Sequence, residues 1–80
     1  MSYRDAEYVI DFFMNRYEFR ITGKRLSSAM NFFTKLDAVD VFDAVDVLEE
    51  KDIDDPFSAW KYFCGICWNK VQQREDEALF

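Results

Sequence analysis

The stretch DDPFSAWKYFCGICWNKVQQR, residues 54–74, is the longest and most apolar segment of the chain and decides its fold. Asp54 or Asp55 can accept hydrogen bonds from the first free N–H groups of a helix, and Pro56 is tolerated in its first turn. At about 100° per residue, one broad apolar face forms from Phe57, Trp60, Phe63, Cys64, Cys67, Trp68 and Val71. The remaining narrow polar strip consists of Ser58, Lys61, Gly65, Asn69 and Gln72. A helix that is apolar around most of its circumference must be covered, so we expect it at the centre of an all-helical domain.

The aromatic content of the chain is high for its size. Eighty residues, half of them hydrophobic, predict a single folded domain over residues 1–80. Nine Phe, four Tyr and two Trp can supply the large buried area that a small core needs. So many rings exceed what one small core can hide, and we therefore expect some to face a partner or a second copy of the chain.

Three shorter helices are expected before the central one. Apolar residues recur at steps of three and four over residues 2–17, 25–36 and 37–51. Ser2 with Asp5 is typical of a helix start, and Thr22 is a candidate cap for the second helix. The pattern predicts a compact all-α domain of four helices, with the C-terminal helix, about 56–74, central. Residues 75–80 are expected to fray.

Most of the net charge of −6 is local. Nine of the sixteen acids lie between residues 37 and 55, where Lys51 is the one base. The candidate partner-binding surface is the acidic face of the third helix, made of Asp40, Asp43, Asp46, Glu49 and Glu50. Acids three apart rotate by about 60° per step, so only part of this set can meet a flat partner. The alternative is a solubilising face without a partner.

A basic patch surrounds the first connection and consists of Arg16, Arg20, Lys24 and Arg25. It can contact phosphate or an acidic protein surface. The alternative is a solvated loop that balances the acidic neighbour. The net negative charge of the whole chain repels nucleic acid at long range, so we do not expect the chain to bind nucleic acid directly.

Catalytic and metal-binding signals are weak. Cys64 and Cys67 match C-x-x-C, but a structural zinc site needs four ligands and the chain has no histidine. We expect thiols packed in the core; zinc shared in a dimer and redox work are the alternatives. Gly65 inside a helix favours close packing by a neighbouring backbone over a bend. The carboxylates lie on an open helix face, whereas catalytic acids need burial to shift their pKa values. We therefore expect that the chain is not an enzyme and that it binds no metal or cofactor.

Location signals point to the cytoplasm, bacterial or of a phage-infected host. Charges interrupt the apolar positions of the first sixteen residues, which is unlike a signal peptide. No run reaches the roughly 20 apolar residues that span a bilayer. Two cysteines without a secretory segment indicate a reducing compartment.

The order of features resembles the helical C-terminal domain of DnaD-type primosome proteins and related phage replisome organisers. The likeness rests on VIDFFMNRYEFRIT (9–22), KRLSSAMNFFTKL (24–36), DVFDAVDVLEEK (40–51) and AWKYFCGICWNKV (59–71). Tyr62 and Ile66 keep the family's spacing, but Lys70 occupies the tryptophan position and the nearest tryptophan is Trp68. The family binds DNA and replication proteins partly through basic C-terminal residues, whereas residues 75–77 here are acidic.

The composition also resembles that of small phage-encoded proteins, including anti-CRISPR inhibitors and other DNA mimics. Together these features predict a non-enzymatic module that binds a basic or nucleic-acid-binding protein by occlusion or bridging. The alternatives are a weak direct DNA-binding replication accessory protein and a self-assembling structural protein, such as a homodimer, in which the basic turn of one copy meets the acidic helix of another.

Overall fold

The computed structural model describes residues 3–78, which form four helices and no strand. They are α1 (Tyr3–Tyr17), α2 (Lys24–Lys35), α3 (Ala38–Lys51) and α4 (Pro56–Ala78). The all-α four-helix prediction is therefore confirmed. Residues 19–22, whose composition is typical of a short strand, form an irregular connection between α1 and α2.

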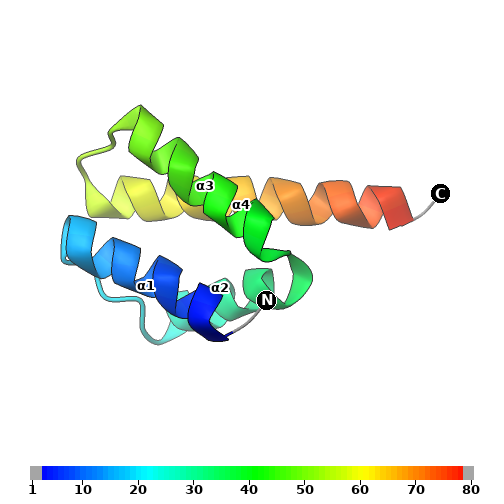
Figure 1. Ribbon diagram of the computed structural model, residues 1–80, viewed down its shortest axis with the longest axis horizontal. Coiled ribbons are helices and arrows are strands. Elements are labelled where there is room, and N and C mark those ends of the chain that lie inside the picture. Colours follow the sequence, from blue (N-terminus) through cyan, green and yellow to red (C-terminus); the bar gives the residue numbers. More distant parts are fainter. Residues whose placement is uncertain (1–2, 79–80) are drawn as a thin grey trace.

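α4 is the helix against which the others pack (Figure 1). It packs along α3 and α2, and its rings meet those of α1. Asp55 is its cap, since the Ser58 N–H donates to Asp55 Oδ2 at 2.8 Å. The helix continues to Ala78, past its expected end near residue 74, and the fraying of residues 75–80 stays a prediction; residues 79 and 80 lie outside the described part. The final turns extend past the other helices (Figure 1).

The core is centred on Phe13 of α1, whose side chain is fully buried. Its ring lies 5.3 Å from that of Trp60 and 5.5 Å from that of Phe63, both edge-on. α3 contributes the aliphatic side of the core with Val41, Ala44, Val45 and Leu48. Edge-to-face ring pairs add about 0.5–1.5 kcal/mol beyond the area that they bury, so this cluster binds α1 firmly to α4.

The connection between α1 and α2 belongs to the core. Phe19 and Ile21 are buried, and the Phe19 ring lies 6.1 Å from Phe13. Gly23, at φ 60°, caps α2 in place of the expected Thr22, because only glycine adopts this conformation without strain. The proposed start at Ser2 lies outside the described residues.

One side of α4 is open, which corrects part of the apolar face predicted for it. Phe57, Tyr62 and Trp68 are 57%, 41% and 51% exposed. With three shorter helices, the bundle covers only the side that carries Trp60 and Phe63. Gly65 is also exposed, and nothing lies within 4 Å of where its Cβ would be. The expectation of close packing at Gly65 within the chain is therefore wrong.

Candidate partner-binding surface

Three of the predicted acidic residues point directly away from the core. The buried side of α3 carries Val41, Ala44, Val45 and Leu48. At about 100° per residue, Asp43, Asp46 and Glu50 lie on the opposite side, and all three are exposed. Val39 shares this side and is 68% exposed. We call Val39, Asp43, Asp46 and Glu50 the α3 outer face; it combines three carboxylates with an exposed apolar side chain.

Asp40 is turned towards α4 and is engaged within the chain. Its carboxylate accepts hydrogen bonds from Arg74 Nε at 2.9 Å and from the same guanidinium through Nη2. Asp37 also pairs with Arg74, at 3.0 Å, and forms a capping box with Asp40 at the start of α3. Only 19% of the Asp40 side chain is exposed. Asp40 therefore holds α3 against α4, a contact between residues 34 positions apart that helical periodicity does not reveal.

Glu49 lies on the other side of α3, in a groove against α1. The groove has a volume of about 420 Å³, and its walls are formed by Tyr8, Asp11, Phe12, Asn15, Arg16 and Glu49. The Tyr8 ring meets Phe42 of α3 edge-on at 5.0 Å. This α1–α3 groove places two carboxylates beside aromatic rings, and its one cation, Arg16, is paired with Asp52, so the setting suits a cationic side chain. The one sequence signal for it was Phe12, which falls outside the buried stripe of α1.

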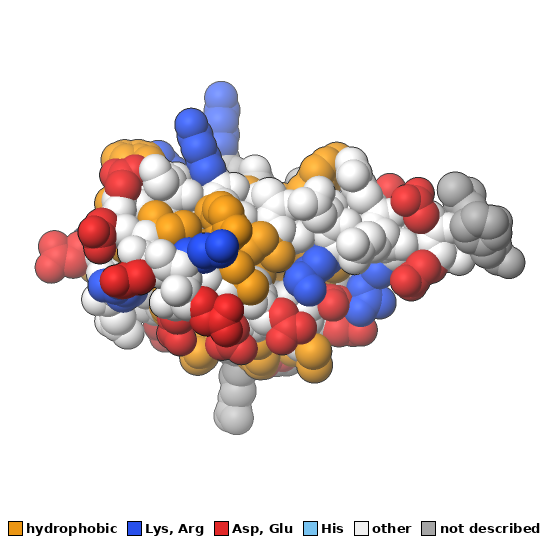
Figure 2. All heavy atoms as spheres, turned by 90° about the horizontal axis from the view of Figure 1, so that it is seen from above, with side chains coloured by type: hydrophobic (Ala, Val, Ile, Leu, Met, Phe, Trp, Pro, Cys, Tyr) orange, Lys and Arg blue, Asp and Glu red, His pale blue; other side chains and the backbone are white. Residues whose placement is uncertain are grey.

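The five predicted acids thus do not form a single ridge. Figure 2 shows acidic side chains in several groups, one of them near the end of α4, with apolar and basic side chains between them. The α3 outer face and the α1–α3 groove lie side by side because Glu49 and Glu50 are neighbours on one helix.

The four predicted basic residues are only partly available. Arg16 donates to Asp52 Oδ1 at 2.8 Å and lies over the Tyr17 ring. The Arg25 guanidinium lies 4.7 Å from the Phe19 ring centroid and 5.5 Å from that of Phe57. Arg20 and Lys24 are exposed. Two of the four cations are therefore engaged by groups of the same chain, which weakens the patch as a phosphate-binding site.

The thiols of α4 are packed, as expected. Cys67 is fully buried and Cys64 is half-buried against the core. Burial raises the pKa of Cys64 to about 11 and that of Cys67 to about 12. Both groups are protonated at neutral pH, and a protonated thiol is a poor nucleophile and metal ligand. Within residues 3–78, no group of three or more His, Cys, Asp or Glu side chains could hold a metal ion.

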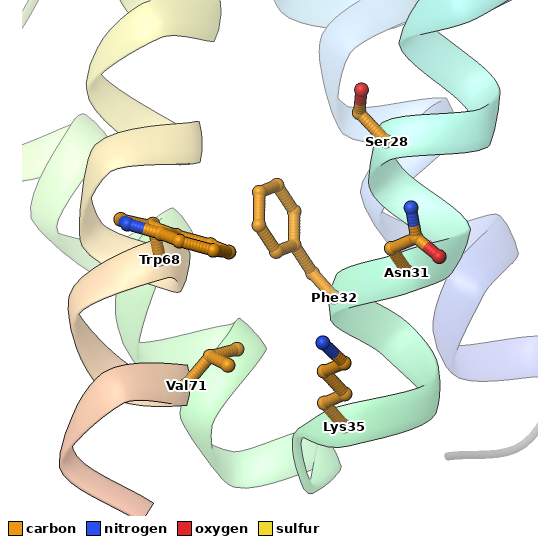
Figure 3. A pocket seen from close by; sticks show the side chains of 6 residues that line it. All are labelled: Ser28, Asn31, Phe32, Lys35, Trp68 and Val71. Carbon is orange, nitrogen blue, oxygen red and sulfur yellow. The ribbon is translucent and has the colours of Figure 1, made fainter. Parts of the chain in front are cut away.

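A second groove separates α2 from α4. Phe32 and Trp68 point toward one another across it (Figure 3). Its volume is about 280 Å³, and Lys35 and Val71 connect it to a smaller hollow, of about 260 Å³, beside Arg74 and Glu75. Trp68 therefore remains half-exposed at the edge of the bundle.

Comparisons with known proteins add no assignment. No protein-family model matches the chain, and no curated protein or solved structure is significantly similar to it. Within the described helices, none is both long and apolar enough to cross a membrane.

Proposed function

We propose that this chain is a non-enzymatic protein-binding module whose partner presents a basic surface, such as that of a protein that handles nucleic acid. The α3 outer face carries the proposal. Asp43, Asp46 and Glu50 are exposed in a row on one side of a rigid helix, beside an exposed valine. The partner would be occluded or bridged by this surface, as a replication adaptor or a phage-encoded inhibitor would do.

The chemistry of the two adjacent surfaces supports a basic partner. Carboxylates on the α3 outer face steer a positively charged surface during encounter and suppress acidic competitors. The α1–α3 groove offers Tyr8 and Phe12 with Asp11 and Glu49, so that a lysine or arginine side chain can meet both a ring and a carboxylate. Exposed rings supply affinity more effectively than surface charges do.

The test is a charge reversal that spares Asp40, because Asp40 holds α3 on α4. Asp43, Asp46 and Glu50 are changed together to lysine, and proteins captured from the source cell and its phage-infected state are identified. A partner that binds the wild type should be lost or weakened by at least about tenfold, since opposed like charges cost several kcal/mol at an interface.

The matched control changes Glu7, Asp54 and Glu77 to lysine, which alters the net charge equally on other exposed positions. Circular dichroism verifies that both variants are folded. Equal capture by the wild type and the α3 variant would exclude the α3 outer face as the binding surface. Equal loss of capture in both variants would show that net charge, and not this face, causes the loss.

A further inference from the structure

The open side of α4 forms a coherent surface that the proposed function does not use. At about 100° per residue, the side of the helix opposite Trp60 and Phe63 begins with the exposed Ser58 and Lys61 and continues with a set of six exposed residues. We call this set the α4 outer face: Tyr62, Gly65, Asn69, Gln72, Gln73 and Asp76. Lys61 and Trp68 lie along its border towards α2.

The α4 outer face is nearly free of charge. Asp76 is the single charged member, and Lys61 and Glu75, one of each sign, flank it on the Trp68 side, in a chain with 32% charged residues and a net charge of −6. Two copies that met through their α3 outer faces would oppose carboxylate to carboxylate. Two copies that met through this side of α4 would not. A two-fold contact uses the same surface of both copies, so that surface must be complementary to itself.

Gly65 is the anomaly that a second copy explains. A glycine in a helix interior costs about 1 kcal/mol relative to alanine. Nothing within the described chain occupies the space beside it, so packing inside one copy gives no reason for it. Gly65 lies between the half-exposed rings of Tyr62 and Trp68, where it leaves a notch that another helix can enter closely.

The positions of the two charges select the orientation. Lys61 and Asp76 are fifteen residues apart, and their midpoint lies between Trp68 and Asn69. Two α4 helices that cross antiparallel at this midpoint bring Lys61 of each copy opposite Asp76 of the other. The same register places the Asn69 side chains together at the two-fold axis and Gly65 opposite Gln72 of the second copy.

We propose that the chain forms an antiparallel homodimer through the α4 outer face, with Gln72 of each copy in the notch at Gly65 of the other and Lys61–Asp76 pairs at both ends. The last turns of α4, which extend past the other helices (Figure 1), supply length for this contact. The dimer leaves the α3 outer face uncovered, because the buried side of α3 faces the core and Asp40 joins it to α4.

The first test is sedimentation velocity of the full chain over a range of concentrations, with Gly65→Lys as the variant. The wild type should dimerise reversibly and the variant should stay monomeric, with at least a tenfold higher dissociation constant. Gly65→Lys does not endanger the fold, since the space is open and lysine is a better helix former than glycine. A wild type that is monomeric at every concentration overturns the proposal, and so does a variant that dimerises equally well.

The second test addresses the register. Lys61→Glu should raise the dissociation constant roughly threefold to tenfold, and Lys61→Glu with Asp76→Lys should restore it. Lys61→Glu with Asp54→Lys is the matched control, with the same net charge but no restored pair. Equal rescue by both double variants would exclude the antiparallel register.

The outcome is separable from that of the proposed function. The Asp43, Asp46 and Glu50 reversal should leave dimerisation unchanged, and Gly65→Lys should leave capture through α3 unchanged.

Discussion

The cysteine thiols of α4 illustrate how burial at a single residue changes its chemistry. Both pKa values are raised by burial, from an ordinary value of 9.0 to about 11 for Cys64 and about 12 for Cys67. The folded chain therefore favours the neutral thiol more strongly than the unfolded chain does. The contribution of the neutral thiols to the free energy of unfolding is complete below about pH 9. It is lost as the pH rises through the pKa values that the thiols have in the folded chain.

We predict that the urea midpoint of the reduced protein falls as the pH rises from about 9 towards 11. Burial also raises the pKa of Tyr17, so part of this loss belongs to that phenol. The double variant Cys64→Ala with Cys67→Ala should retain only the Tyr17 part of the alkaline slope. An identical slope in the wild type and the double variant would contradict the assignment to the thiols.

At the scale of the element, the ends of the helices depend on backbone conformation as much as on side chains. α1 ends where Glu18 adopts a left-handed conformation, φ 53°, and the Phe19 N–H bonds back to Phe13 O at 3.2 Å. This turn directs Phe19 into the core. A residue with a Cβ is strained here by roughly 1–2 kcal/mol, whereas glycine is not.

We predict that Glu18→Gly stabilises the protein by about 0.5–1 kcal/mol and raises its melting temperature by a few degrees. Glu7→Gly, in the middle of α1, is the control and should destabilise it by about 1 kcal/mol. Thermal unfolding followed by circular dichroism measures both. Destabilisation by Glu18→Gly would show that the glutamate side chain stabilises the fold by more than the left-handed backbone conformation destabilises it.

At the scale of the whole molecule, one ring cluster joins the N-terminal and C-terminal halves. Phe13 lies within about 6 Å of five other rings, which belong to Phe12, Tyr17, Phe19, Trp60 and Phe63. These rings come from α1, the first connection and α4. A domain of this size has a free energy of unfolding of only about 5–15 kcal/mol, so the cluster is a large share of what maintains the fold.

Phe13→Ala should therefore lower the free energy of unfolding by about 3–5 kcal/mol, through lost burial and the cavity that it leaves. Phe57→Ala is the matched control, because its ring is mostly exposed at the edge of the same cluster. Urea denaturation measures both variants. A loss below about 1 kcal/mol for Phe13→Ala would show that the core is not organised around this ring.

The helices themselves could be predicted because their signals are local. Apolar spacing of three and four residues and the cap at Asp55 act within a few residues, although Gly23 and not the expected Thr22 caps α2. The same local rules misjudged the end of α4, where polar helix formers continue the helix to Ala78. They also missed that Phe19 and Ile21 of the connection are buried.

The sequence by itself determined the class of fold, since side-chain periodicity and capping depend on near neighbours in the chain. Only the tertiary structure decided how the candidate surfaces are divided. It paired Asp40 with Arg74, 34 residues away, and left Asp43, Asp46 and Glu50 exposed on the opposite side of α3 from the core. It also left Gly65 and one side of α4 uncovered, because three short helices can surround only part of a 23-residue one.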